Sequence, residues 1–401
     1  MIKTKAYFAI KKLVEIEPVL IVIGPRRVGK TTVIKSLAEE DQNGRLYLSA
    51  DRLPKRDYKN ATELVSYLKF EGILKQAHRQ IYIDEAHFLT NLGLILKNFF
   101  DESKYGVVVT GSGSLKIYEG IGRELVGRKA IYYMYPFDFE DYLLALGKNT
   151  KQGLEKVGAD VVASDLADFW EWGGYPEVVM AKTREEKMKK QQRVFQTYLD
   201  EDVKLLLGKE VFFKFEEVLG YLAKSVGSLL KIDNLRQEMG LTNKSIQRII
   251  EVLDHNFISY HLEPFPLGRA DEVKKHRKTY FVDNGLLNFV LRKKLTPVSG
   301  KLAENYVLTQ LLKKKTEFIN LYFWQRRSGN EIDFIRHDML TNKVTPIEVK
   351  EGESENIPRI FETMEKYYGE LVEEYVVINK SINKMRKFGQ KIVRFVPAYL
   401  V

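Results

Sequence analysis

The chain has 401 residues, of which 44% are hydrophobic, and it carries a net charge of +10 at pH 7. This length suits about two to four domains, and the absence of cysteine excludes disulfides, thiolate catalysis and cysteine-ligated metals. No apolar run approaches the roughly 20 residues that span a bilayer, and residues 1–10 lack a signal-peptide pattern. We therefore expect a cytoplasmic protein with no membrane contact, whose evenly spread positive charge permits a nucleic-acid partner.

The first predicted strand, residues 19–23, runs into a segment that matches the phosphate-loop pattern G-x-x-x-x-G-K-[ST] at every fixed position. A helical pattern follows from Thr32. Backbone N–H groups and the positive end of that helix would face the phosphates of a nucleotide. Lys30 would reach the terminal phosphates, and Thr31 would hold Mg²⁺. The predicted phosphate-binding residues are Gly24, Pro25, Arg26, Arg27, Val28, Gly29, Lys30, Thr31 and Thr32.

Three more predicted strands, at residues 45–50, 80–85 and 106–110, alternate with helical patterns around 61–76 and 91–103. This alternation is typical of a parallel sheet with helices on both faces. The strand at 80–85 ends in the carboxylates Asp84 and Glu85. We expect Asp84 to order Mg²⁺ through its water shell and Glu85 to polarise the attacking water; the plainer interpretation is a solvated strand end.

Hydroxyl and arginine side chains follow the next strand. Thr110 or Ser112 would contact the terminal phosphate or the water, unless the segment is only a glycine- and serine-rich turn. Arg123 or Arg128 would act as an arginine finger supplied by a neighbouring subunit, and the alternative is an ordinary surface arginine.

The middle of the chain is predicted to be helical. Residues 150–210 would form a lid over the nucleotide domain, with a turn at residues 173–176. Helices at 218–226 and 232–239, a turn capped by Thr242 and a third helix then form a helix-turn-helix pattern. Strands at 258–262 and 279–282, joined by a basic loop, would add a wing.

The third of these helices carries Ile246, Ile249, Ile250 and Leu253 on one face and Asn243, Lys244, Gln247 and Arg248 on the other. The polar face suits base edges or phosphates, although winged helices also serve as protein-docking modules. The basic run 274–278 is either a nucleic-acid contact or a solvated face.

The last hundred residues contain a second set of carboxylates. A helix begins near Gly300, and strands are predicted at 321–325, 330–335 and 345–350. Glu348 and Lys350 lie on the same face of a strand because the side-chain period is two. Asp333 and Glu348 would bind Mg²⁺, Lys350 would help to activate water, and Glu304 would be an outer ligand.

Taken together, the chain resembles the prokaryotic AAA-type ATPases that carry a C-terminal restriction-endonuclease-like domain. The resemblance covers nearly the whole chain and rests on residues 24–31, 83–87, 110–112, 127–128, 173–176, 281–286, 331–334 and 347–350. It implies ATP binding and hydrolysis, a winged helix and a PD-(D/E)XK-type fold, and it favours Arg128 as the finger.

The expected architecture is therefore α/β, in four parts: an AAA-type P-loop domain (1–145), a helical lid (146–210), a winged helix (211–290) and a nuclease-like domain (291–401). We expect Mg²⁺-dependent ATP hydrolysis coupled to DNA binding or processing, and a homo-oligomer is the partner arrangement that an arginine finger supplied in trans would require. The alternative is an ATP-controlled regulatory or assembly switch with an inert nuclease-like scaffold. A helicase of the Asp-Glu-Ala-His type is weaker, because no second motor domain is evident in the sequence.

Overall fold

The computed structural model describes residues 2–54, 58–102, 105–112, 130–148, 153–204, 207, 209–266, 271–291 and 300–401. The chain divides into two compact units. The N-terminal unit comprises Met1–Pro136 with His255–Phe257, and the C-terminal unit comprises Phe137–Asp254 with Ile258–Val401. In the described ranges, no helix is both long and apolar enough to cross a membrane.

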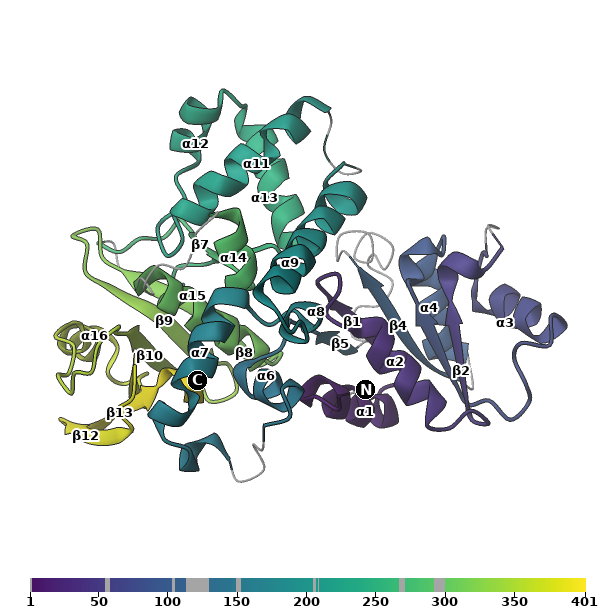
Figure 1. Ribbon diagram of the computed structural model, residues 1–401, viewed down its shortest axis with the longest axis horizontal. Coiled ribbons are helices and arrows are strands. Elements are labelled where there is room, and N and C mark those ends of the chain that lie inside the picture. Colours follow the sequence, from purple (N-terminus) through teal and green to yellow (C-terminus); the bar gives the residue numbers. More distant parts are fainter. Residues whose placement is uncertain are drawn as a thin grey trace. The chain divides into compact units, whose positions relative to one another are not determined.

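A five-stranded parallel sheet forms the centre of the N-terminal unit, with strand order β2-β3-β4-β1-β5 (Figure 1). β1 is buried at all six positions, as its continuous apolar run requires. The three strands predicted after β1 are confirmed, whereas β5 was not anticipated. The strands are β1 (Val19–Gly24), β2 (Arg45–Ser49), β3 (Gln80–Asp84), β4 (Gly106–Ser112) and β5 (Ala130–Tyr133).

Helices connect and cover these strands. The helix after the phosphate-loop sequence, α2, packs against four neighbouring elements of the sheet, β1 to β4. α1 was not predicted; it begins after Thr4, whose side chain accepts a hydrogen bond from the Tyr7 N–H. The helices are α1 (Lys5–Ile16), α2 (Lys30–Glu39), α3 (Ala61–Phe70) and α4 (Leu92–Glu102), with 3-10 turns at Ala50–Arg52 and Ala86–Phe88.

The first part of the C-terminal unit is helical, as predicted. The turn after α7 depends on Gly173, which has a φ of +73° and on which a Cβ would lie 2.1 Å from Asp283 Oδ1. Asp283 accepts hydrogen bonds from the N–H groups of Gly174 (2.7 Å) and Leu286 (2.9 Å). This part contains α6 (Phe139–Ala145), α7 (Ala159–Trp172), α8 (Pro176–Val179), α9 (Arg184–Tyr198) and α14 (Asn284–Val290), a 3-10 turn at Leu154–Lys156 and a π-helical turn at Leu199–Val203.

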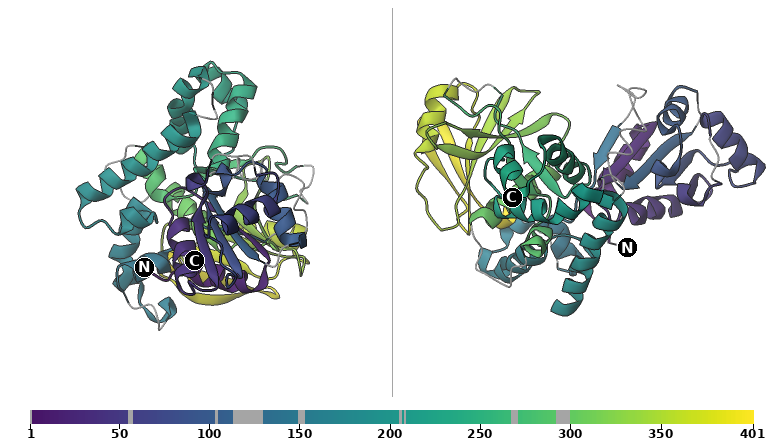
Figure 2. Two further views of the ribbon diagram at one scale, coloured as in Figure 1. Left: turned by 90° about the vertical axis from the view of Figure 1, so that its right-hand side faces the viewer. Right: turned by 90° about the horizontal axis from the view of Figure 1, so that it is seen from above.

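The helices and strand pair predicted for residues 211–282 are present. Thr242 Oγ1 accepts a hydrogen bond from the Ser245 N–H at 3.1 Å, which confirms the predicted cap. In Figure 2 the teal and green helices of residues 209–255 stand together at one end of the C-terminal unit. The elements are α11 (Lys209–Lys224), α12 (Ile232–Met239), α13 (Asn243–His255) and the antiparallel strands β6 (Ser259–Leu262) and β7 (Lys278–Phe281).

The connection between β6 and β7 differs from a free wing loop. The Phe265 N–H donates to the Phe323 carbonyl oxygen at 2.8 Å, and the Val273 N–H donates to the Gln325 carbonyl oxygen at 2.9 Å. Both acceptors lie on β8 (Ile319–Gln325), the edge strand of the next sheet. An exposed strand edge offers unpaired backbone groups, and this connection satisfies some of them.

A six-stranded mixed sheet, in the order β12-β13-β11-β10-β9-β8, completes the C-terminal unit. β8, β9 and β10 confirm three predicted strands. The remaining strands and helix α16 were not anticipated. Besides β8, the elements are β9 (Glu331–Asp338), β10 (Lys343–Val349), β11 (Tyr375–Asn379), β12 (Lys384–Phe388), β13 (Lys391–Pro397), α15 (Gly300–Lys313), α16 (Ile360–Tyr368) and a 3-10 turn at Ala398–Leu400.

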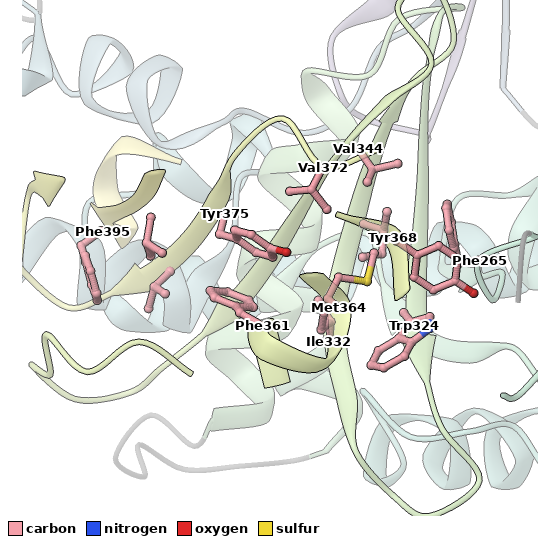
Figure 3. Packing of buried hydrophobic residues seen from close by; sticks show 13 residues of the cluster. Phe265, Trp324, Ile332, Val344, Phe361, Met364, Tyr368, Val372, Tyr375 and Phe395 are labelled. Atoms are coloured by element: carbon pink, nitrogen blue, oxygen red, sulfur yellow. The ribbon is translucent and has the colours of Figure 1, made fainter. Parts of the chain in front are cut away.

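Helix α16 covers one face of this sheet. Its side chains Phe361, Met364 and Tyr368 point into a cluster that includes Trp324 and Tyr375 from the strands (Figure 3). Phe361 and Met364 are fully buried. Burial of a large apolar side chain contributes about 1.5–3 kcal/mol to the stability of the folded state. This cluster therefore stabilises β9 and β10, the strands that carry Asp333 and Glu348.

Candidate functional site

The predicted phosphate loop lies at the carboxyl end of β1. Gly24, the last residue of this strand, has no room for a side chain, because a Cβ would lie 2.0 Å from the Met134 carbonyl oxygen. Gly29 has a φ of +97° immediately before α2, and Arg27 has a φ of +63°. These left-handed residues turn the backbone so that the loop leads directly into the N-terminus of α2.

Within this loop Lys30 is buried and faces the backbone. Its Nζ donates hydrogen bonds to the carbonyl oxygens of Gly24 (2.8 Å) and Pro25 (2.6 Å). Thr31 and Thr32 are exposed, as is Arg27, while Pro25 and Val28 are buried. The loop thus presents two hydroxyl groups and a helix N-terminus at its outer side, which is the chemistry that anionic ligands favour.

Asp84 and Thr110 lie together at the same edge of the sheet. β3 and β4 are paired in parallel, with Ile83 opposite Val109, so the next residues of both strands are also neighbours. The Thr110 hydroxyl donates a hydrogen bond to Asp84 Oδ1. The Tyr47 hydroxyl donates to Asp84 Oδ2 at 3.0 Å. The buried Asp84 carboxylate is therefore held by two hydroxyl donors in a fixed orientation.

Glu85 leaves the strand in an unusual backbone conformation, with a φ of +51°. Its N–H donates to Asp84 Oδ1 at 3.1 Å, and its Oε2 lies 3.2 Å from Nδ1 of His87. A left-handed non-glycine residue costs of order 1 kcal/mol and is common at functional sites. The Glu85 side chain thus lies beside His87, whereas the Asp84 carboxylate is bound by Tyr47 and Thr110, so the two carboxylates have different partners.

Two residues of this site were not found from the sequence. Tyr47 lies in the middle of β2 and belongs to no sequence motif, so the sequence did not identify it. In the structure, burial together with the Asp84 charge raises the pKa of its hydroxyl. His87 was visible only as part of the Asp-Glu-Ala-His sequence. The predicted residues Arg123 and Arg128 lie outside the described residues, as does the side chain of Ser112.

The C-terminal unit gathers the second predicted set from three elements. β9 and β10 are antiparallel, with Phe334 opposite Ile347, which brings Asp333 and Glu348 to neighbouring positions. Asp333 Oδ2 accepts a hydrogen bond from the Val349 N–H at 2.8 Å. Lys350 Nζ lies 2.7 Å from Glu348 Oε2. Asp333, Glu348 and Lys350 thus form a contiguous group.

Glu304 approaches this group from α15, and its polar partners Tyr280 and Lys278 lie on β7. It accepts a hydrogen bond from the Tyr280 hydroxyl, and its Oε1 lies 3.9 Å from Lys278 Nζ. Lys278 also lies 3.0 Å from Glu331 Oε2. The four basic residues before Lys278 are exposed, whereas the Lys278 side chain is only 1% exposed. The basic run therefore consists of four exposed residues followed by one buried lysine.

The carboxylates of this cluster hold protons more tightly than ordinary ones. Burial, reinforced by the Asp333 charge, raises the pKa of Glu304 to about 8 and that of Glu348 to about 7. Burial also raises the pKa of Asp333, although Lys278 opposes this shift. Among the described residues, no three His, Asp or Glu side chains are arranged to hold a metal ion as they stand. The role of Glu304 as a metal ligand therefore stays a prediction.

The polar face of α13 is as the sequence predicts. Ile246, Ile249, Ile250 and Leu253 are buried, and Asn243, Lys244 and Gln247 are exposed. Arg248 is half-buried and lies 3.4 Å from Glu251. The helix thus presents a row of hydrogen-bond donors away from its apolar face.

A parallel sheet with a phosphate loop after β1 and a buried aspartate at the end of β3 defines the N-terminal unit as a P-loop ATPase domain of the AAA type. Family models agree: residues 17–143 match an AAA domain, residues 163–296 a domain of unknown function (DUF8612) and residues 299–400 another domain of unknown function (DUF4143).

An uncharacterized protein of Haemophilus influenzae is 24% identical over 307 residues, which are 73% of this chain and 74% of that protein. The Walker-type ATPase of Pyrococcus abyssi has a TM-score of 0.43 and 14% identity, over 73% of this chain and 95% of that chain. The RuvB Holliday junction branch migration motor of Thermotoga maritima has a TM-score of 0.32 and 16% identity, over 73% and 92% of the two chains.

Proposed function

We propose that the N-terminal unit binds ATP and hydrolyses it. The observation that carries this proposal is the convergence of the loop of residues 24–31, the Asp84–Thr110 pair and Glu85 at the carboxyl edge of one parallel sheet. The loop N–H groups and Lys30 would bind the phosphates, with Lys30 exchanging its two carbonyl partners for phosphate oxygens. Glu85 would accept a proton from the attacking water.

The residues present fit Mg²⁺, which prefers oxygen ligands. The exposed residue Thr31 would bind the ion through its hydroxyl group. The buried Asp84 carboxylate would bind the ion through a water molecule. The ion would neutralise charge on the phosphates. Tyr47 and Thr110 would orient Asp84, and the Thr110 hydroxyl is a further donor close to the terminal phosphate. Arg128 from a second copy of the chain would complete the site, which makes a homo-oligomer part of the proposal.

ATP turnover would be coupled to DNA. The support is the exposed row Asn243, Lys244 and Gln247 on α13, the third helix of the proposed winged helix, in a chain with a charge of +10. Residues 263–265 and 271–273 are attached to β8 and the residues that follow it, and the basic residues 274–277 are exposed and would form the tip of the wing. In this proposal α13 and residues 274–277 contact the duplex, with the lid (146–210) linking them to the ATPase domain.

A second candidate function is metal-dependent hydrolysis of a phosphodiester by a restriction-endonuclease-like domain (291–401). The specific observation in its favour is the contiguous group of Asp333, Glu348 and Lys350 on adjacent strands. Asp333 and Glu348 would bind one ion, and Lys350 would stabilise the hydroxide or the developing charge. If this group is inert, the C-terminal unit is a scaffold and the protein an ATP-controlled switch.

One experiment tests these proposals together. The ATPase rate of the full chain is measured with Mg²⁺ and with no DNA, single-stranded, duplex or branched DNA, while the DNA is followed for retention and cleavage. Stimulation by DNA supports the coupling, and cleavage lost in Asp333→Asn supports the second activity. ATP hydrolysis without DNA retention or cleavage favours the switch, and an absence of ATP turnover under every condition contradicts the first proposal.

A further inference from the structure

Gln191 is a buried glutamine on α9 whose side-chain amide makes no hydrogen bond. The residue is only 2% exposed. Among the described residues, neither its Oε1 nor its Nε2 atom has a hydrogen-bond partner. A buried amide without hydrogen bonds destabilises the folded chain, and such groups are rare in native proteins. This amide therefore suits a ligand that offers both a donor and an acceptor.

Gln191 lines a groove in the C-terminal unit with a volume of about 1230 Å³. Helices α7, α9, α11 and α14 contribute to the lining, and both α9 and α11 pack against α14. Phe195 and Phe289 are half-buried in the groove, with their ring centroids 5.3 Å apart. Met188, another lining residue, is 57% exposed. The groove thus combines apolar surface that solvent still reaches with one unsatisfied amide.

The size and the charge of the groove indicate the class of its occupant. Small-molecule pockets enclose about 300–1,000 Å³, so this groove is larger than a small ligand needs. Its described lining carries three carboxylates and two cations: Glu171, Glu216, Glu217, Arg184 and Lys224. A nucleic acid strand is bound by an excess of cations, which this lining lacks. A polypeptide segment fits both the size and the charge.

We propose that this groove binds an extended segment of another protein, and that the Gln191 amide pairs with a peptide group of that segment. Every peptide group offers an N–H donor and a C=O acceptor, which are the partners that the Gln191 amide lacks. The torsion that orients a glutamine amide is broad, so a small rotation would turn the covered amide atoms toward the segment. The rings of Phe195 and Phe289 would contact an apolar side chain of the segment.

Two charges on α11 define the side chains that the segment should carry. Glu216 and Lys224 are exposed, and within the described ranges neither forms an ion pair. They are eight positions apart, which is about 12 Å along a helix axis. An extended chain advances about 3.3 Å per residue, and alternate side chains share a face. A basic and an acidic residue four positions apart, with an apolar residue midway, would therefore match this groove.

The test begins with a phage-displayed library of random linear peptides, selected on the full chain. We expect one enriched group of peptides with this pattern of basic, apolar and acidic residues. A fluorescent synthetic peptide of the group should bind Glu216→Lys about fivefold or more weakly, because an attraction becomes a repulsion. Replacing the basic residue of the peptide by glutamate should restore part of that affinity. Glu238→Lys, at an exposed position on α12, is the control and should bind normally.

The role of Gln191 is tested through the backbone of the same peptide. Gln191→Met keeps the length of the side chain but removes both polar atoms, and it should weaken binding about tenfold. N-methylation of single peptide bonds should weaken binding to the unsubstituted protein at one position, and Gln191→Met should be insensitive to methylation there. A purely structural role would leave the two methylation profiles alike. Gln237→Met, an exposed glutamine on α12, is the control.

Thermal unfolding of the free protein tests whether the amide is unsatisfied. Gln191→Met removes a buried polar group without a partner, so its Tm should equal or exceed that of the unsubstituted protein. A lower Tm would show that the amide already has a partner, such as a buried water, and would overturn the inference. If Gln191→Met fails to fold, the variants at the exposed Glu216 still decide whether a peptide binds in this groove.

Three binding results would also overturn the inference. One is a selection that enriches no peptides of the expected pattern. Another is a peptide whose affinity is unchanged in Glu216→Lys and in Gln191→Met. The third is single-stranded DNA that displaces the peptide and itself binds Gln191→Met more weakly, which would assign the groove to nucleic acid. None of these results bears on the proposed ATP hydrolysis, because no residue of the phosphate loop lines the groove.

Discussion

Lys30 Nζ lies 2.8 Å from the carbonyl oxygen of Gly24 and donates a hydrogen bond to it. The lysine thereby joins the first and seventh residues of the phosphate-loop sequence across the turn. The same ammonium also bonds to the Pro25 carbonyl oxygen. In the proposed mechanism these two hydrogen bonds hold the Lys30 ammonium beside the place where a phosphate would lie. When ATP binds, phosphate oxygens would replace the two carbonyl oxygens as its acceptors.

We predict that Lys30→Ala abolishes nucleotide binding. The substitution removes the only side-chain ammonium of the loop sequence, and charge-assisted hydrogen bonds are worth about 1.5–3 kcal/mol each. We therefore expect at least about a 100-fold loss of affinity for a fluorescent ATP analogue, measured by equilibrium titration. Lys35→Ala, an exposed lysine on the same helix, is the matched control. Equal affinity in Lys30→Ala and Lys35→Ala would refute the assignment.

Glu85→Gln should separate binding from turnover. The amide keeps the size of the side chain but cannot take a proton from water, so kcat should fall by about 10²-fold or more while ATP affinity stays close to normal. Steady-state hydrolysis and equilibrium binding measure the two quantities separately. Glu39→Gln, an exposed glutamate on α2, should change neither. Hydrolysis at the normal rate in Glu85→Gln would remove this residue from the proposed mechanism.

Thr110→Val tests the hydroxyl that holds Asp84. Valine matches the shape of threonine, but the buried Asp84 would lose one of its two hydroxyl donors. An unsatisfied buried polar group costs about 1–3 kcal/mol, so we expect lower stability by denaturant unfolding and a lower ATPase rate. Thr110→Ser keeps the hydroxyl and should retain most of both. Equal loss in the two variants would point to packing instead of the hydrogen bond.

Asp283→Ala should destabilise the C-terminal unit. This buried carboxylate accepts the N–H groups of Gly174 and Leu286, and so joins residues 173–176 to the start of α14. Alanine leaves both N–H groups without this acceptor, and we expect a loss of about 2–4 kcal/mol in the free energy of unfolding. Asp233→Ala, an exposed position on α12, is the control. A loss below about 0.5 kcal/mol would show that other acceptors replace Asp283.

We predict that the ion pairs of Glu40 make the stability of the N-terminal unit depend on pH in the acid range. Hydrogen bonds from Lys11 and Tyr7 lower the pKa of Glu40 to about 2. A carboxyl group whose pKa falls on folding stabilises the folded state above its unfolded pKa of about 4.3, and this contribution disappears as the pH falls through about 2.

The effect should be modest, because surface ion pairs contribute about 0.2–1 kcal/mol. Glu40→Gln should therefore lower the free energy of unfolding at pH 7 and lose less stability than the unsubstituted protein between pH 5 and pH 2. Urea unfolding across this range is the measurement, and Glu39→Gln is again the control. Parallel pH profiles for Glu40→Gln and the unsubstituted protein would contradict the prediction.

Much of the N-terminal unit was predictable because its signals are local. The apolar run 19–23 marks a buried strand, Gly24 and Asp84 end strands β1 and β3, and Gly29 begins α2; parallel pairing brings such strand ends to one edge. Strand β5 was missed because it is only four residues long and only partly buried. Helix α1 was missed because no motif marks it.

The contacts of the second cluster were not predictable in the same way. Asp333, Glu348 and Lys350 form a sequence pattern on two predicted strands, so the sequence singled them out. Lys278, in contrast, is the last residue of a basic run whose other members are exposed. Nothing in the run distinguishes its last lysine from the others. Its burial depends on the pairing of β6 with β7 and on Phe323 and Glu331, which follow much later in the chain.

By itself the sequence determined the phosphate loop, the order of the first strands, the faces of α13 and the identity of the acidic residues, because each depends on neighbours within a few positions. Only the tertiary structure decided which donors hold Asp84, which acceptor organises the turn at residues 173–176 and which cation lies among Glu304 and Glu331. Those relationships join residues far apart in the chain, and burial in a folded core, not local spacing, decides which polar groups must find one another.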